Sequence, residues 1–283
     1  MAFRQNIFWD KCLNTSYRMA IPKKIHWCWL SGDPLPPMLQ KCIRSWKRVL
    51  PDYEIICWDM QRFDIHSVKF VEQACAARKW AFAADYIRLY ALYTEGGIYL
   101  DSDVMVFKKF DRFLHYAAFS GIDYVPHWIA VRNEKHKYLG YGIQAAVIGA
   151  EKGNPWIKMC MEHYHDKDFT FENEMTDAGI APEVLAHYAH TGFGFQYDKD
   201  CAQPQYLKGN IALFPPWVFA NMFLEANLNS YVLHLGEYSW GDNGRRSHSR
   251  LRKFYRKLCS ANRFFAMMHY LRKRWIKKLT GKR

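Results

Sequence analysis

Two aspartates separated by one residue, Asp101 and Asp103, directly follow the apolar run Ile98–Leu100. In an extended chain, residues two apart project to the same side, so the two carboxylates converge and Ser102 faces away. Converging carboxylates repel each other, and a divalent cation held by hard oxygen ligands removes that repulsion. The pair therefore predicts a magnesium or manganese site that also accepts diphosphate oxygens. Because this spacing is also frequent on solvated loops, the elements around the pair must decide between the two interpretations.

A second charged pair, Asp85 and Arg88, precedes the aspartates in a segment without Gly or Pro. At positions i and i+3 of a helix the two side chains share a face. One interpretation is a surface ion pair, which contributes little to stability. The neighbours favour another interpretation, because the surrounding residues are small or apolar: Ala81, Ala83, Ala84, Ile87, Leu89, Ala91 and Leu92. A charged pair inside such a stretch predicts side chains that point into a polar cavity.

The elements that position these residues alternate between helices and apolar strands, which predicts an α/β fold with a largely parallel or mixed sheet. The predicted strands are 25–30, 53–58, 98–100 and 144–149. The predicted helices are 38–49, 78–94 and 158–164, the second of which ends at Gly96-Gly97 and the third of which follows Pro155. Ligands of such sheets bind beyond the carboxyl ends of the strands, where Asp101 and Trp29 are expected to share one rim.

Two blocks of the sequence together resemble a known family. The run AFAADYIRLYALYTEGGIYLDSDV (81–104) and the upstream PKKIHWCWLSG (22–32) are similar to the DXD sugar transferases of glycosyltransferase family 32. They also resemble the glucosylating domains of large clostridial toxins. The resemblance implies a GT-A (Rossmann-like) fold, a nucleotide-sugar donor, most readily UDP-linked, and a manganese or magnesium ion.

The resemblance also implies roles for individual donor-site residues. Trp29 would stack on the nucleotide base, with a core tryptophan as the alternative, whereas Trp27 is expected in the core. Asp85 would accept hydrogen bonds from donor-sugar hydroxyls, and Arg88 would either hold Asp85 or reach the sugar or diphosphate. Tyr99 would contact the sugar or phosphate, or be an ordinary core tyrosine.

The same resemblance implies the metal ligands. Asp103 would bind the ion directly, and Asp101 would bridge to it, directly or through water, and to donor hydroxyls. The third ligand would be His234, with Glu237 as the alternative, because two aspartates supply too few ligands. Ser239 and Trp240 would hold the β-phosphate through hydroxyl and indole N–H donors. Ser102 would take no part.

The resemblance further implies the reaction, a metal-dependent transfer of a hexose or N-acetylhexosamine to a saccharide acceptor with retention of the anomeric configuration. The sequence offers no clear covalent nucleophile, which favours a front-face displacement. Gln144 and the 176–179 turn lie where members of that family place donor- and acceptor-facing residues. His187, His190 and the 191–195 loop would line the acceptor side, or would be surface loop. One alternative is a metal-dependent nucleotidyl or phosphoryl transferase, but the sequence shows neither the Gly-rich loop nor the basic cluster that such enzymes usually have near the metal. The other alternative is a non-catalytic membrane- or nucleic-acid-binding module.

Charge is distributed unevenly along the 283 residues, whose formal net charge is +13. Residues 243–283 carry 15 of the 40 Lys and Arg residues and no acidic residue, so the remainder has 25 basic residues against 27 acidic ones. This asymmetry argues against a nucleic-acid-binding domain, which would spread basic residues over the fold. We expect a GT-A catalytic domain over 1–244 and a basic amphipathic helical tail over 245–283.

The basic tail predicts docking on an anionic membrane surface, and a lipid-linked saccharide acceptor would suit that position. The alternative is a solvated helix packed on the domain. No apolar run is long enough to span a membrane, and the N-terminus lacks a signal-peptide core. We therefore expect a cytoplasmic protein, peripheral on the inner face of the cell membrane, acting in capsule, O-antigen or exopolysaccharide synthesis. The eight cysteines, irregularly spaced, are expected to be free thiols.

Overall fold

The computed structural model describes residues 20–124, 140–172, 175–176, 179–197, 201–221 and 225–236. Several predicted features lie outside these ranges, namely Glu237, Ser239, Trp240, residues 177–178 and the basic tail 245–283. They stay predictions, as does the division into two domains.

The fold is built on a seven-stranded mixed sheet with the order β2-β1-β3-β6-β5-β10-β9. Its strands are β1 (Lys24–Cys28), β2 (Glu54–Trp58), β3 (Gly97–Leu100), β5 (Ala118–Tyr124), β6 (Tyr141–Ala150), β9 (Gln205–Leu207) and β10 (Ile211–Phe214). β1 is parallel to β2 and β3, whereas β6 runs antiparallel to both of its neighbours, β3 and β5. β10 is parallel to β5 and antiparallel to β9. The predicted α/β class with a mixed sheet is confirmed.

A second, three-stranded sheet has the order β11-β12-β4. It comprises β4 (Val104–Val106), β11 (Phe219–Ala220) and β12 (Val232–His234). β12 is antiparallel to β4, and its register pairs His234 with Val104, the residue after Asp103. This pairing joins segments about 130 residues apart and brings His234 beside the two aspartates. A separate two-stranded ribbon pairs β7 (Phe171–Glu172) with β8 (Met175–Thr176).

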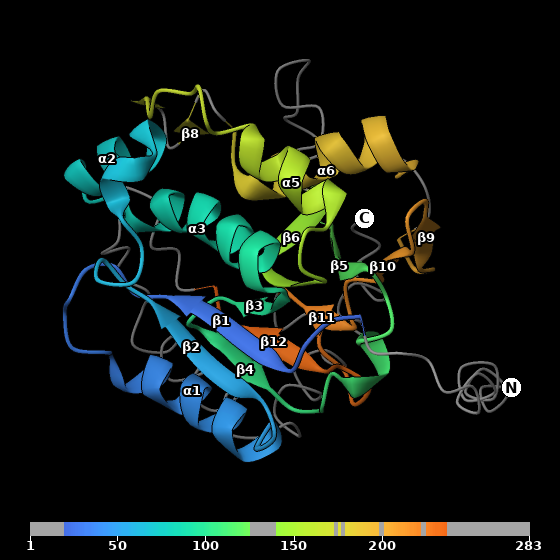
Figure 1. The fold of residues 1–283 in the computed structure, drawn as a ribbon. Helices are drawn as coiled ribbons and strands as arrows, with labels where there is room; N and C mark the ends of the chain where they lie inside the picture. The colour runs from blue at the N-terminus through green and yellow to red at the C-terminus, as the bar shows by residue number, and fades with distance from the viewer. Residues whose placement is uncertain are drawn as a thin grey trace, which may run out of the picture.

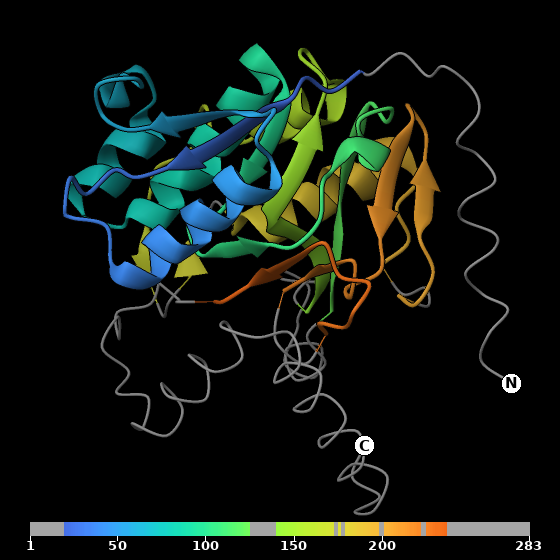
Figure 2. The ribbon, with the colours of Figure 1, turned by 90° about the horizontal axis from the view of Figure 1, so that it is seen from below.

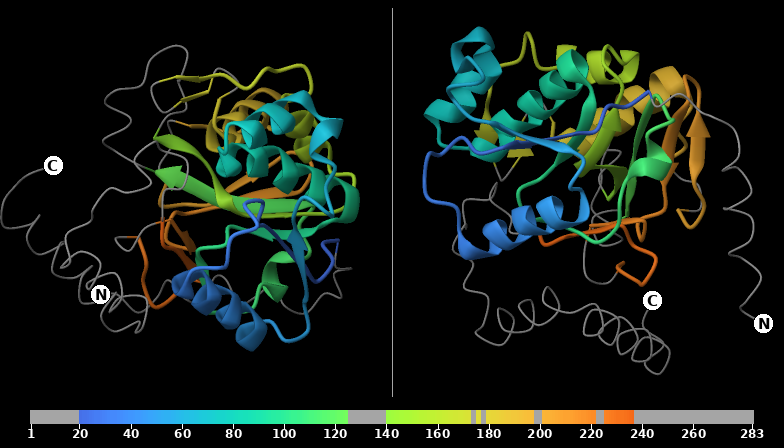
Figure 3. Two further views of the ribbon diagram at one scale, coloured as in Figure 1. Left: turned by 90° about the vertical axis from the view of Figure 1, so that its left-hand side faces the viewer. Right: turned by 60° about the horizontal axis from the view of Figure 1, so that its bottom comes forward.

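Helices cover both faces of the large sheet (Figures 1 and 3). On one face lie α2 (Lys69–Ala76), α3 (Trp80–Glu95), α5 (Pro155–Glu162) and α6 (Ala181–Tyr188). On the other lie α1 (Pro37–Val49) and the three-stranded sheet, as Figures 1 and 2 show. Two apolar cores follow from this layering, one under α3 and α5 around Trp156, the other under α1 around Trp46. Trp27 belongs to the second core, as predicted.

Short helical turns complete the described chain: Ile65–Ser67, Asp111–Phe113 and the π-helical turn Ala189–Phe193. None of the helices in the described ranges is both long and apolar enough to cross a membrane. The cysteines in these ranges are free thiols, as predicted: Cys28, Cys42, Cys57, Cys75, Cys160 and Cys201.

α3 is the element that leads the chain into the site. It begins after Arg78, which takes a positive φ of 55°, and ends at Gly96, whose φ of 67° stops the helix. Gly96 is also crowded, because an added Cβ would lie 2.7 Å from the backbone nitrogen of Lys152. The helix therefore starts two residues later and ends one residue later than the predicted range 78–94. Its small residues let it lie close against the sheet, and β3 follows at once.

Candidate active site

The Asp101-Ser102-Asp103 segment forms a turn between β3 and β4. The backbone N–H of Val104 donates to the carbonyl of Asp101 at 3.0 Å, and the N–H of Asp101 donates to Ala146 at 2.9 Å. The expectation of extended chain here is wrong, because β4 leaves the large sheet to pair with β12. The turn still directs both carboxylates into one cavity, and Ser102 lines that cavity as well.

His234 converges on the two aspartates from β12. Its Nε2 lies 3.1 Å from Oδ1 of Asp103 and 3.9 Å from Oδ2 of Asp101. One ligand atom from each of the three residues lies within 4.8 Å of the other two, an arrangement able to hold a metal ion. The register of β12 with β4 fixes this approach, together with a hydrogen bond of 3.2 Å from the Leu235 N–H to the Asp103 carbonyl.

The electrostatics of this cluster show an excess of negative charge. Burial by itself lowers the pKa of His234, but the charges of Asp103 and Asp101 outweigh it and raise that pKa to about 9. A proton is thus attracted to the place where a divalent cation would neutralise the two carboxylates. Carboxylate oxygens and an imidazole nitrogen at these separations fit such a cation, and the imidazole suits manganese better than magnesium, which prefers oxygen ligands alone.

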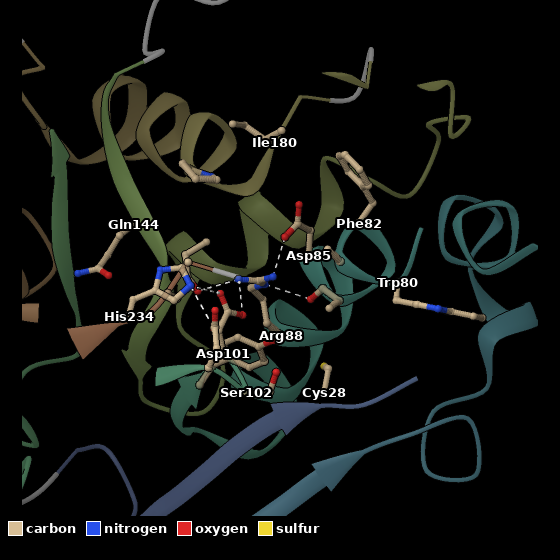
Figure 4. A pocket seen from close by; sticks show the side chains of 18 of the residues that line it. Cys28, Trp80, Phe82, Asp85, Arg88, Asp101, Ser102, Gln144, Ile180 and His234 are labelled. Atoms are coloured by element: carbon tan, nitrogen blue, oxygen red, sulfur yellow. Dashed lines mark hydrogen bonds and ion pairs between the residues drawn. The ribbon is translucent and has the colours of Figure 1, made fainter. Parts of the chain in front are cut away.

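The Asp85–Arg88 pair on α3 is almost wholly buried beside this cluster. Nη2 of Arg88 lies 2.7 Å from Oδ1 of Asp85, and Nη1 lies 3.4 Å from Oδ1 of Asp101. Figure 4 shows the guanidinium between the two carboxylates. Both Asp85 and Arg88 line the cavity, so the predicted cavity-facing pair is confirmed and the surface ion pair is wrong.

Further contacts hold the Arg88 side chain in place. Its Nε donates to the carbonyl of Ala84 at 3.1 Å, its Nη1 donates to the carbonyl of Ala145 at 2.8 Å, and its guanidinium lies 4.7 Å over the Tyr99 ring. Burial raises the pKa of Asp85 to about 6, although Arg88 opposes the shift. Oδ2 of Asp85 accepts a hydrogen bond of 3.3 Å from the Ala181 N–H at the start of α6.

Two residues that the sequence did not suggest complete the polar end of the cavity. Asp123, at the end of β5, is 5% exposed and its Oδ1 accepts a hydrogen bond of 2.8 Å from Nδ2 of Asn221. Oδ1 of Asn221 in turn lies 2.6 Å from Nδ1 of His234. Each is a single polar residue at the end of an apolar run, a pattern too common to identify a site. Only the pairing of distant strands brings them together.

The cavity has a volume of about 310 Å³ and a mixed lining. Its charged lining residues include four carboxylates and one guanidinium, from Asp85, Arg88, Asp101, Asp103 and Asp123. Its larger apolar lining residues are Trp29, Leu30, Leu39, Trp80, Phe82, Ile180 and Pro182. In Figure 4, Trp80 lies across the cavity from His234 and Gln144.

Trp29 and Tyr99, the remaining predicted donor residues within the described ranges, also line this cavity. Trp29 follows the last residue of β1, and its Nε1 donates to the carbonyl of Asp33 at 2.7 Å. Tyr99 is 2% exposed, and burial raises its pKa well above the usual range. Its clearest contact is the support of Arg88, and a direct contact with a donor stays a prediction.

Of the predicted acceptor residues, Gln144 lines the cavity. Its Nε2 donates to the carbonyl of Phe219 at 2.6 Å, and its buried Oε1 has no hydrogen-bond partner within the described ranges. His187, His190 and the 191–195 loop are not among the described residues that line it. They contact one another instead, as in the 2.7 Å hydrogen bond between Nδ1 of His190 and the Phe195 carbonyl.

Comparison with known proteins places this geometry in context. Residues 36–120 match the family described as "Glycosyltransferase sugar-binding region containing DXD motif". That segment contains Asp85, Arg88, Tyr99, Asp101 and Asp103, so the predicted resemblance to DXD sugar transferases is confirmed there. A curated relative, inositol phosphoceramide mannosyltransferase 3 of Schizosaccharomyces pombe, is 31% identical over 142 residues, 49% of this chain. The chain spans 35% of that relative's length.

Two solved glycosyltransferase structures match this chain at low similarity. The PaToxG glycosyltransferase matches with a TM-score of 0.44 and 20% identity, covering 60% of this chain and 69% of that one. A glycosyltransferase involved in glycosylation of the major capsid of PBCV-1 matches with a TM-score of 0.43 and 12% identity, covering 83% of this chain and 100% of that one. At this level of similarity no residue role passes from those proteins to this chain.

Proposed function

We propose that this protein, whose residues 36–120 match a DXD-containing glycosyltransferase region, transfers a sugar from a nucleotide-sugar donor in a metal-dependent reaction. The observation that carries the proposal is the convergence of Asp101, Asp103 and His234 in a cavity that also holds the buried Asp85–Arg88 pair. A metal group and a fixed carboxylate in one cavity match the two halves of a nucleotide sugar, its diphosphate and its hydroxyls.

Asp101, Asp103 and His234 would hold the divalent cation. When bound, a cation there supplies charge neutralisation for a leaving diphosphate. The described lining of the cavity has four carboxylates against one guanidinium and the imidazole of His234, whose proton a bound metal ion would replace. The excess of carboxylates is the reason for proposing a metal-dependent reaction, and the imidazole is the reason for preferring manganese.

Arg88 would hold Asp85 in place and leave the diphosphate to the metal group. Its donors are directed at Ala84, Ala145, Asp85 and Asp101, which leaves little capacity for a ligand. Asp85 keeps acceptor capacity toward the cavity, since an ionised carboxylate has about four lone-pair sites. We propose that this carboxylate accepts hydrogen bonds from donor-sugar hydroxyls.

The finer assignment remains the one proposed from the sequence: a UDP-linked hexose or N-acetylhexosamine, transfer with retention, and base stacking by Trp29. The mannosyltransferase relative is named for inositol phosphoceramide, a lipid, which supports an acceptor that carries a lipid; we propose that the acceptor of this chain is a lipid-linked saccharide. Docking of the tail 245–283 on an anionic membrane, on the cytoplasmic side of the cell membrane, belongs to the same proposal, as does a role in polysaccharide synthesis.

A donor screen tests the proposal. The full chain is incubated with a panel of nucleotide sugars and Mn²⁺, and release of nucleoside diphosphate is measured. We expect release from one donor, at least about 100-fold reduced in Asp103→Asn, because loss of one charged ligand weakens the metal group. The matched control is Asp166→Asn, which removes an exposed carboxylate that does not line the cavity. Release of sugar 1-phosphate instead would indicate a nucleotidyl transferase, and full activity of Asp103→Asn would overturn the metal assignment.

A further inference from the structure

We propose that Asn221 is a positioning residue that fixes the ring of His234, with Nδ1–H donating to Asn221 and Nε2 directed at Asp101 and Asp103. Asp123 anchors Asn221 in the orientation that this requires. The inference rests on the proposed function, since it concerns the residue expected to be the third metal ligand.

Three hydrogen-bonding groups from separate strands form one chain. Oδ1 of Asn221 lies 2.6 Å from Nδ1 of His234, and Nδ2 of Asn221 donates to Oδ1 of Asp123 at 2.8 Å. On the other side of the imidazole, Nε2 lies 3.1 Å from Oδ1 of Asp103. His234 is thus held between an amide and the carboxylates of the metal group.

The chemistry of the partners sets the direction of each hydrogen bond. A carboxylate only accepts, so Asp123 selects the NH₂ end of the Asn221 amide. The oxygen of that amide must then face His234, and a carbonyl oxygen also only accepts. Nδ1 of His234 must therefore carry a proton. In the neutral ring Nε2 then has its lone pair free, as a metal ligand requires.

The backbone around Asn221 supports this placement. Asn221 directly follows β11, and its N–H donates to Oε2 of Glu225 at 2.7 Å. Asp123 is the next-to-last residue of β5 in the large sheet, whereas His234 ends β12 of the small one. The amide therefore connects the two sheets at the point where the metal group is assembled.

A partner of this kind has a known effect in metal sites. Histidine ligands usually donate their other ring N–H to an oxygen, which fixes the tautomer and the ring orientation, and loss of that oxygen weakens metal affinity by about 10–100-fold. Asn221 also lines the cavity, so a direct contact with the donor is the competing role. Metal binding in the absence of any nucleotide sugar separates the two roles.

The test compares the full chain with Asn221→Ala in two measurements made without donor. Mn²⁺ affinity, followed by electron paramagnetic resonance, is expected to fall by about 10–100-fold in the variant. The ring ¹⁵N–¹H signal of His234 in the metal-free protein is expected to show a protected Nδ1 proton that Asn221→Ala loses. Asn229→Ala, an exposed asparagine of the same loop, is expected to change neither.

The wild-type measurement makes the test independent of whether Asn221→Ala folds, because the inference requires a protected Nδ1 proton on His234 in the unaltered protein. The inference is overturned if wild-type His234 shows no protected Nδ1 proton, or if Asn221→Ala leaves the proton and the Mn²⁺ affinity unchanged. The proposed function fails separately, if wild-type protein binds no Mn²⁺ although the Nδ1 proton is present.

Discussion

Asp101 lies between two groups of charged residues whose charge is balanced in different ways. We call them the α3 flank, formed by Asp85 and Arg88, and the β12 flank, formed by Asp103 and His234. On the α3 flank, Arg88 lies against both Asp85 and Asp101, and its remaining donors are directed at backbone carbonyls. On the β12 flank, Asp101 and Asp103 face an imidazole whose pKa is raised to about 9 by their charge. The first flank is neutralised by the chain itself, whereas the second attracts a cation.

The difference separates structure from function within one cavity. A buried pair whose partners are all in place stabilises the fold whether or not a ligand is present, because removing either member leaves an uncompensated buried charge. Converging carboxylates repel each other, and in the metal-free protein the protonated imidazole of His234 is what offsets that repulsion on this flank. Each prediction below acts mainly on one of the two flanks.

The largest effect is expected from breaking the α3 flank. Arg88→Leu leaves Asp85 buried without its counter-charge, which should lower the free energy of unfolding by about 3–5 kcal/mol. Urea unfolding followed by circular dichroism measures this. Arg44→Leu, on the exposed side of α1, is the control and should cost far less. A loss below about 1 kcal/mol for Arg88→Leu would mean that the pair is not structural.

Filling the β12 flank should stabilise the protein. At Mn²⁺ concentrations 100-fold above the dissociation constant, the free energy of unfolding should rise by about 2.7 kcal/mol, because the ion binds only the folded state. Thermal unfolding with and without Mn²⁺ measures this. Asp103→Asn should lose the increment and Asp166→Asn should keep it. Equal stabilisation of both variants would place the ion elsewhere.

The smallest expected effect concerns pH on the α3 flank. The pKa of Asp85 is raised by burial to about 6, above its unfolded value of 3.8. The folded state therefore binds the extra proton first, so this contribution to stability is complete below pH 3.8 and is lost as pH rises through about 6.

A difference measurement isolates that contribution. The free energy of unfolding of the wild type relative to Asp85→Asn should be higher at pH 5 than at pH 8, by on the order of 1 kcal/mol. Urea titrations of both proteins at the two pH values test it. A difference that is constant with pH, or lower at pH 5, would show that burial does not raise the pKa of Asp85 in the folded protein.

Sequence and structure agree best where the information is local. The helix around Asp85 and Arg88 and the strand before Asp101 follow from apolar spacing and the Gly96 stop, which nearby residues determine. The conformation of Asp101-Ser102-Asp103 could not be predicted from the local sequence, because the turn depends on the pairing of β4 with a strand about 130 residues away. Extended chain was the wrong expectation, although both carboxylates still reach one cavity.

Asp123 and Asn221 were not predictable for a related reason. Each is one polar residue at the end of an apolar stretch, and nothing in its neighbourhood distinguishes it from a surface residue. They belong to the site only because they form a hydrogen-bonded chain with His234, and this chain requires β5, β11 and β12 to meet. The resemblance to a family indicated His234 itself, because a downstream histidine belonged to the pattern that the sequence matched.

The central claim is that Asp101, Asp103 and His234 hold a divalent cation while Asp85 and Arg88 do not. A crystal of the full chain soaked in Mn²⁺, with diffraction measured at the manganese absorption edge, tests it most directly. The account predicts one anomalous peak coordinated by oxygens of Asp101 and Asp103 and by Nε2 of His234, with Arg88 still bound to Asp85. A peak coordinated by Asp85, or no peak in the cavity at saturating Mn²⁺, would contradict it.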